Sequence, residues 1–271
     1  MNSDYPSHTQ EEKPEVVYPG ILHVVAVMLI TFAFALVVGF IAMLWGGKTG
    51  LFLSEIVIII PALLFVIIAR APILKIFRLK IPGGSIILNS IFLAIGVFVL
   101  ADQLDRIIQT FFPMPQTMIN AMEEMMTFRT IFDGIIIIVS GVILAGLCEE
   151  MLFRGIFQGT LETRWNPYGA VVISACLFAM VHLLPWTMVQ IFLMGLVLGY
   201  ITLKINSIIP AAIVHGGNNL FSIIMINLGE EKYGWYTTGV LVRPVILVAA
   251  LFFLFIGLRA FVVTKPSRQI S

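Results

Sequence analysis

Hydrophobic residues fall in long runs along most of the chain, and short polar segments separate these runs. A run of about 20 mostly apolar residues can cross the hydrocarbon core of a bilayer as one helix. Eight runs have or approach this length. Their approximate ranges are 21–45, 51–69, 85–104, 131–163, 168–184, 186–204, 208–228 and 237–263. The pattern therefore predicts an all-α fold, a polytopic membrane helical bundle with about eight transmembrane helices.

The fourth run differs from the others because it contains charged residues. Its apolar part, 135–147, continues into EEMLFRGIFQGTLETRW, and no helix breaker appears before Asn166 and Pro167. We therefore predict a single long helix that carries charge inside it.

The one sizeable connection between runs covers residues 105–130. Its methionines recur at helical spacing, which predicts an amphipathic helix lying at the membrane surface. A loop packed on the bundle is the alternative interpretation. The methionines on the shared apolar side are Met114, Met118, Met122, Met125 and Met126.

Composition excludes a soluble domain. Hydrophobic residues make up 59% of the 271 residues and charged residues only 11%, whereas soluble domains are about 45–50% apolar and about 25% charged. The formal net charge is +1 and no stretch is rich in lysine or arginine, so we expect no nucleic-acid partner. Cys148 and Cys176 both lie in apolar runs, which gives no disulfide framework and no CxxC metal motif.

Charge also predicts the orientation in the membrane. With eight spans both termini share a side, and eleven of the 16 lysines and arginines fall on that side against five opposite. Cytoplasmic segments carry the excess of positive charge, so we expect both termini in the cytoplasm. Residues 1–20 lack the features of a signal peptide, and we expect them to form a flexible polar tail. The predicted organisation is this tail, N-terminal helices with the surface segment (21–130), a catalytic core (131–228), and a last helix with a short tail (229–271).

Ionisable residues inside the predicted spans are the candidates for function, because burying charge in a bilayer costs free energy. They are Glu55, Glu149, Glu150, Arg154, His182 and His215. Glu150 and Arg154 are spaced i,i+4 and can pair on one helix face, which leaves Glu149 free for chemistry. The plainer reading is a buried ion pair beside a stray glutamate. Glu55 lies near the start of its run, where its carboxylate could reach the membrane surface.

His182 is expected to face Glu149. Glu149 lies 17 residues before the turn at Asn166 and His182 lies 16 residues after it. Equal counts from the turn of an antiparallel hairpin place both residues at equal depth, about 25 Å from the turn. Phe178, one turn before His182, would form a wall of the pocket between them.

His215 and Asn219 form a third polar element, spaced i,i+4 on one helix face, with Gly216 and Gly217 between them. These glycines allow close helix packing in a membrane. A polar packing face that hydrogen-bonds across helices is the structural alternative. Taken with Glu149 and His182, the set suits hydrolysis: a carboxylate held by a histidine can act as general base on water. A second histidine and an asparagine can donate hydrogen bonds to an oxyanion.

At these three segments the sequence resembles the family of CAAX-processing and bacteriocin-processing proteases, also called the CPBP or Abi family. The family pattern is EExxxR, then FxxxH, then HxxxN or HxxxD. All three motifs occur here in order, as Glu149-Glu150 with Arg154, Phe178 with His182, and His215 with Asn219. The resemblance covers about residues 130–228, and no motif position departs from the pattern.

The resemblance implies an intramembrane endopeptidase with a helical core. By this resemblance, Glu149 and His182 activate the water, and His215 and Asn219 form the oxyanion pocket. Glu150, Arg154 and Phe178 support them. The implied substrate is a membrane-associated peptide or protein tail in the lipid bilayer, and the absence of organelle signals favours a prokaryotic plasma membrane.

The need for a metal stays open at this point. Family members were first described as metalloproteases, so a zinc site at Glu149, His182 and His215 is the alternative. HExxH is absent, and Arg154 would place a cation close to any such metal. We therefore favour a mechanism without a cofactor.

Two other functions compete with the protease. A non-catalytic immunity or scaffold protein has no need for an unpaired buried glutamate. A proton-coupled transporter would explain the buried ionisable groups, but no inverted repeat appears in the sequence.

Overall fold

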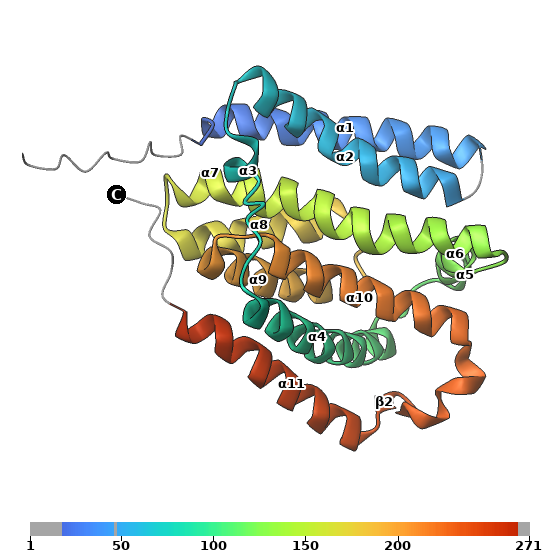
Figure 1. Cartoon of the computed structure of the whole chain (residues 1–271). Coiled ribbons are helices and arrows are strands. Elements are labelled where there is room, and N and C mark those ends of the chain that lie inside the picture. Colours follow the sequence, from blue (N-terminus) through green and yellow to red (C-terminus); the bar gives the residue numbers. More distant parts are fainter. Residues whose placement is uncertain (1–17, 46–47, 265–271) are drawn as a thin grey trace, which may run out of the picture.

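The computed structural model describes residues 18–45 and 48–264, and its helices follow the hydrophobic runs closely (Figure 1). Most of the predicted polar tail, residues 1–20, lies outside the described residues. The helices are α1 (Ile21–Trp45), α2 (Lys48–Ile68), α3 (Ile73–Ile76), α4 (Gly84–Phe111), α5 (Gln116–Met126), α6 (Ile131–Ile138), η1 (Val139–Glu149), η2 (Met151–Phe157), α7 (Gln158–Glu162), α8 (Pro167–Val181), α9 (Met188–Ile205), α10 (Ile209–Leu228), η3 (Glu230–Trp235) and α11 (Pro244–Val263). Two short strands, β1 (Thr237–Thr238) and β2 (Leu241–Val242), pair antiparallel.

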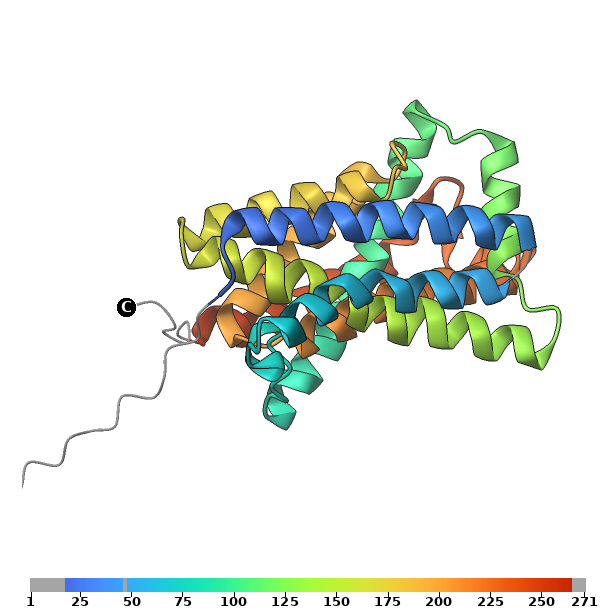
Figure 2. The ribbon, with the colours of Figure 1, turned by 90° about the horizontal axis from the view of Figure 1, so that it is seen from above.

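The helices α6, η1, η2 and α7 follow one another directly and form one rod of residues 131–162, called here the central helix. The hairpin of α1 and α2 packs against it through α2, and α10 packs against η1. Beyond α10 lie α4 and then α11, and a second hairpin of α8 and α9 contacts η2 and α7. Figure 2 shows from above that α1 and α2 lie side by side along the length of the bundle.

The predicted membrane bundle is confirmed. In the part of the chain that the structure describes, six helices are long and apolar enough to cross a membrane. Of the other two expected spans, α2 has 21 residues, and α8 is shorter, with the 15 residues Pro167–Val181. At 15 residues, α8 is about 22 Å long, less than the roughly 30 Å of the hydrocarbon core.

Local chemistry explains where the core helices begin. Thr130 and Asp133 form a capping box at the start of α6. The side chain of Asn166 accepts hydrogen bonds from Tyr168 N and Gly169 N at 2.8 and 3.4 Å, and Pro167 follows at the first helical position of α8. Asn206, with a φ of 52°, ends α9 in the left-handed conformation.

Two of the predicted helix ends were wrong. The last span was expected from residue 237, but α11 begins at Pro244, because residues 237–242 form a hairpin with Gly239 at a φ of 60°. The third span was expected to end at 104, but α4 continues to Phe111. Its polar last turns are held by local side-chain bonds, such as Asp102 with Arg106 at 2.8 Å.

The connection 105–130 does contain the expected helix, α5, and none of its described side chains is fully buried. Met118 and Met122 lie on its half-buried side, whereas Met125 is exposed. The end of α5 is tied to α10, because Asn227 Nδ2 donates to Met126 O at 2.9 Å. The helix is therefore observed together with its packing on the bundle, and its place at a membrane surface stays a prediction.

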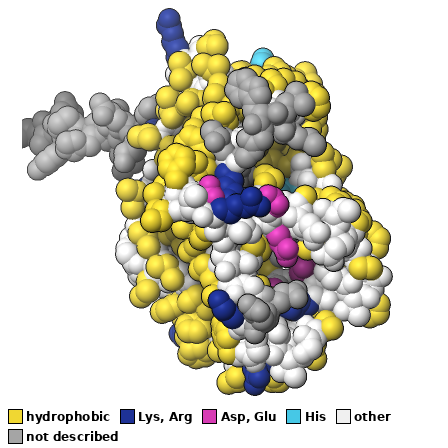
Figure 3. All heavy atoms as spheres, turned by 90° about the vertical axis from the view of Figure 1, so that its right-hand side faces the viewer, with side chains coloured by type: hydrophobic (Ala, Val, Ile, Leu, Met, Phe, Trp, Pro, Cys, Tyr) yellow, Lys and Arg dark blue, Asp and Glu magenta, His cyan; other side chains and the backbone are white. Residues whose placement is uncertain are grey.

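Charged side chains gather at the end of the bundle where α5 lies, and hydrophobic side chains surround them (Figure 3). At this end Lys48 Nζ pairs with Asp133 Oδ2 at 2.8 Å and joins the start of α2 to the start of the central helix. A charged end with apolar sides is the surface expected of an integral membrane protein.

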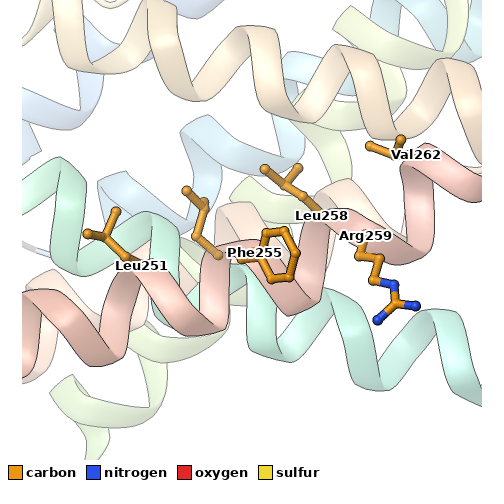
Figure 4. A pocket seen from close by; sticks show the side chains of 6 residues that line it. Leu251, Phe255, Leu258, Arg259 and Val262 are labelled. Atoms are coloured by element: carbon orange, nitrogen blue, oxygen red, sulfur yellow. The ribbon is translucent and has the colours of Figure 1, made fainter.

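The outward side of α11 is apolar. A pocket of about 510 Å³ runs along it (Figure 4), with Arg259 among the residues that line it. Leu251, Phe255 and Val262 are exposed there, as suits contact with lipid chains.

The close contact of α4 with α11 depends on two glycines. A Cβ on Gly257 would lie 2.6 Å from Leu93 N, and one on Gly96 would lie 2.6 Å from Leu254 N. These backbones therefore approach too closely for any side chain.

We expect Gly257→Ala to lower the free energy of unfolding by about 1–3 kcal/mol, because the added methyl must push two backbones apart. Unfolding in detergent measures it. Gly39→Ala in α1 is the control: the Cβ meets open space, and alanine is the better helix former by about 1 kcal/mol. Equal stability of the two variants would contradict the tight α4–α11 contact.

Candidate active site

The central helix changes its winding where the motif residues lie. Val139–Glu149 and Met151–Phe157 are π-helical, with i→i+5 backbone bonds. Such winding inside an α-helix is uncommon and occurs often at functional sites. The sequence predicted the length of this helix but gave no signal for its winding.

Helix α10 approaches this stretch closely through Gly216. A Cβ at Gly216 would lie 2.7 Å from Val142 O. One at Gly146 of the central helix would lie 3.0 Å from Ala212 O. The absence of side chains at the two glycines lets η1 and α10 approach closely.

Glu150 forms a buried ion pair in the site. Its Oε1 accepts from Arg154 Nη1 at 3.0 Å and contacts His215 Nδ1 at 3.0 Å. The side chains of Glu150 and Arg154 are fully buried, and that of His215 is 3% exposed. The expected i,i+4 pair is therefore present, and His215 joins it. Removal from water makes such contacts strong, but their desolvation is costly.

Arg154 makes two further contacts. Its Nη2 donates to Gly195 O of α9 at 3.3 Å, and its Cζ lies 4.1 Å from the ring centre of Phe178. Phe178 also meets the rings of His182 and His215 edge to face, at 4.8 and 5.6 Å between centroids. Phe178 thus lies between the two histidines and covers the arginine, as expected for a pocket wall.

Glu149 and His182 lie opposite each other, at the equal depth that their spacing from Asn166 predicted. His182 Nε2 is 3.9 Å from Glu149 Oε2, longer than a direct hydrogen bond. His182 is the C-terminal cap of α8. Its Nδ1 lies 2.7 Å from Phe178 O, and because a carbonyl only accepts, this contact places the proton on Nδ1. The lone pair of Nε2 then faces the glutamate.

Asn219 bonds across helices, as the structural alternative predicted. Its Nδ2 donates to Gly141 O at 2.8 Å. One amide hydrogen is used in this way, and the second remains for another acceptor. The structure therefore places Asn219 beside the π-helix, and an oxyanion role for it stays a prediction.

Sequence reasoning placed Glu55 near the membrane surface, and the structure corrects this. Its Oε2 is buried and has no hydrogen-bond partner in the described part of the chain. The carboxyl group interacts electrostatically with that of Glu149. The charge itself was visible in the sequence, but the packing of α2 on η1, which brings Glu55 to the site, was not.

The donor groups do not converge as a metal site requires. Among the described residues, no group of three or more His, Cys, Asp and Glu side chains could hold a metal ion. The alternative zinc set of Glu149, His182 and His215 is not such a group. The side chains present therefore do not fit zinc, and no step is derived through it.

The remaining polar groups can activate water. The side chains of Glu149 and His182 are 13% and 27% exposed. The side chains of Glu150 and His215 are only 0% and 3% exposed. The carboxylate oxygen of Glu149 lies near the lone pair of His182 Nε2. The buried ion pair of Glu150 and Arg154 follows on the same helix. This arrangement suits proton abstraction from a water molecule.

Comparisons with known proteins agree with the motifs. Residues 131–221 match the model of the type II CAAX prenyl endopeptidase Rce1-like family. A segment of 87 residues is 34% identical to "UPF0177 protein YxdF" of Lactococcus lactis subsp. lactis (strain IL1403) and covers 32% of this chain. The match spans about half, 48%, of that relative's length. No solved structure matches the chain. The resemblance read from the three motifs is confirmed for the central helix and the helices that follow it.

Proposed function

We propose, from the match of residues 131–221 to the Rce1-like family, that this protein is an intramembrane endopeptidase that hydrolyses a peptide bond with activated water. The single observation that carries the proposal is the geometry of Glu149 and His182. A carboxylate oxygen without a hydrogen-bond partner faces an imidazole lone pair across 3.9 Å. A water oxygen about 2.8 Å from both atoms fits this gap.

The chemical step follows from these positions. Glu149 takes a proton from the water, and the oxygen forms a bond to the carbonyl carbon of the substrate. His182 orients the water through Nε2. The C–N bond then breaks, and the proton held by Glu149 passes to the leaving amine nitrogen.

The oxyanion of the tetrahedral intermediate needs donors on the other side of the site. His215 supplies Nε2–H when its ring carries both protons, and the Glu150 carboxylate 3.0 Å from Nδ1 balances that charge. Asn219 supplies its second amide hydrogen. Arg154 and Phe178 act only through Glu150 and the histidine rings, and are positioning residues.

The substrate is a membrane-associated peptide or protein tail, because the site lies within an apolar helical bundle. The first and last described residues lie at the same end of the bundle (Figure 1). We further propose that this end faces the cytoplasm, in line with the Lys/Arg distribution, and that the membrane is a prokaryotic plasma membrane.

Peptide release tests the function. Membranes from source cells that lack the protein are mixed with liposomes containing wild-type protein or His182→Ala, and released peptides are identified by mass spectrometry. We expect products with wild type that the variant does not release. Identical peptide profiles from two folded proteins would overturn the protease proposal and favour a binding role.

Metal removal should have little effect. The rate of cleavage is expected to stay within about twofold after treatment with 1,10-phenanthroline or EDTA, because the side chains that the structure describes form no three-ligand site of the kind zinc requires. Loss of activity that zinc restores would contradict a metal-free mechanism. A zinc-dependent peptidase treated in parallel is the control for chelator action.

A further inference from the structure

A pocket with two lysines lies at the end of the bundle where the chain enters α4. Its volume is about 230 Å³, and it lies between the start of α4, the end of α9 and the residue that follows α11. Lys80 and Lys204 supply its charged side chains, and Ile81, Ile86 and Ile205 are among its apolar residues. None of the residues that line it is acidic. The hydrolytic step proposed above uses none of these residues.

The walls of this pocket are fixed by bonds between the α3–α4 connection and the turn before α10. Ser207 Oγ donates to Lys80 O, and Arg78 O accepts from the next backbone N–H of that turn at 3.1 Å. Arg78 is itself held, because its guanidinium pairs with the buried carboxylate of Glu162. Lys80 and Lys204 therefore lie on backbone segments that are tied together, and the pocket between them is preformed.

The positive charge of the pocket is not balanced within the described part of the chain. Glu162 lies at this end of the bundle, but its carboxylate is committed to Arg78. No described carboxylate forms an ion pair with Lys80 or Lys204. Lys204 Nζ lies 5.6 Å from the ring centre of Tyr200, a contact that does not neutralise its charge. The pocket therefore presents two cations and attracts an anion.

The pocket lies at the level where lipid headgroups meet the hydrocarbon core. The helices α4, α9 and α11 are all long and apolar enough to cross a membrane. Because residues at the ends of all three line one pocket, the pocket marks a boundary of the apolar region that they span. Phospholipid phosphates lie just outside this boundary, and lysines there attract anionic lipids. The isoleucines of the pocket suit the apolar carbons that follow such a phosphate.

We propose that this pocket binds the phosphate of an anionic phospholipid, with Lys80 and Lys204 as its two cationic contacts. A phosphodiester carries a full negative charge, and two ammonium groups can donate hydrogen bonds to its oxygens. Gly83, which precedes α4, also lines the pocket, so the positive end of that helix dipole adds to the attraction. A zwitterionic lipid would bring its own ammonium group beside the lysines. The pocket therefore selects lipids of net negative charge, whether or not the protein is an endopeptidase.

Lipid binding by the purified full-length protein tests this inference. Native mass spectrometry from detergent micelles measures the apparent Kd for phosphatidylglycerol, for phosphatidylcholine, and for phosphatidylglycerol with an excess of inorganic phosphate. Wild type is compared with the double variant Lys80→Gln and Lys204→Gln. The matched control is Arg70→Gln with Lys75→Gln, which removes the same charge from two exposed positions on the connection between α2 and α4.

We expect wild type to bind phosphatidylglycerol about tenfold or more tightly than phosphatidylcholine. The double variant should lose about tenfold or more in affinity for phosphatidylglycerol, because each lysine near an anionic lipid strengthens binding about fivefold. The control should stay within about twofold of wild type, and inorganic phosphate should not displace the lipid. Equal affinities for the two lipids, or an equal loss in the control, would overturn the proposal. Displacement by inorganic phosphate would overturn the lipid as the occupant.

A measurement on wild type covers the case in which the double variant does not fold. Phosphatidylglycerol with a photoreactive group on its headgroup is cross-linked to the protein, and mass spectrometry locates the label. We expect label within residues 79–86 or 203–208, which surround the two lysines. Label confined to other segments would overturn the proposal.

A charge-retaining variant separates charge from shape. Lys80→Arg with Lys204→Arg keeps both positive charges, and we expect its affinity for phosphatidylglycerol to stay within about threefold of wild type. A loss as large as that of the glutamine variant would overturn the proposed electrostatic contact.

Discussion

Replacement of Glu149 by glutamine is expected to lower kcat by about 10³-fold, within the range of about 10²–10⁴ that general-base catalysis contributes. The amide has nearly the shape of the carboxylate but cannot take the proton from water. KM should change much less, because the peptide chain is bound by other groups. The measurement is the rate at which protein in liposomes cleaves the substrate identified by the peptide-release experiment.

We expect the Glu149→Gln change to leave the stability of the fold unaltered. Glu149 Oε2 has no hydrogen-bond partner in the described part of the chain, so its replacement breaks no such bond. Thermal unfolding in detergent is the control, and we expect a midpoint close to that of wild type. A folded Glu149→Gln protein with activity within about tenfold of wild type would show that another group is the base.

The sequence predicted the fold well because the bilayer restricts it. Every backbone polar group in a membrane must be bonded within a helix or barrel, so apolar length predicts a helix. This physical rule located the helices that carry all three motifs. It failed at residues 237–242, where Val240, Leu241 and Val242 extend the apolar run but the segment forms a hairpin.

The site was predicted in part, for a different reason. Spacing along one helix predicted the pair of Glu150 and Arg154, and equal distance from Asn166 predicted the approach of His182 to Glu149. These are short-range relations. The contact of His215 with Glu150 joins residues 65 apart, and the approach of Glu55 depends on how α2 packs. Periodicity along one helix does not contain such information.

Loss of the buried arginine is the change with the largest expected effect on stability. Arg154→Met leaves the fully buried Glu150 carboxylate without its ion pair. Removing one partner of a buried pair costs about 3–5 kcal/mol, and here the remaining carboxylate keeps only its contact with His215. The free energy of unfolding, measured by titration with a denaturing detergent, should fall by this amount.

A double variant separates charge from packing. Glu150→Gln with Arg154→Met removes both charges, and we expect it to regain about 2 kcal/mol or more relative to Arg154→Met alone. Arg129→Met is the control for an exposed pair, since Arg129 and Glu124 are 64% and 66% exposed, and its effect should not exceed about 1 kcal/mol. If the double variant is as unstable as Arg154→Met, the arginine stabilises the bundle through Phe178 and Gly195 and not through the charge of Glu150. The buried pair would then support the histidine beside it without being required for the fold.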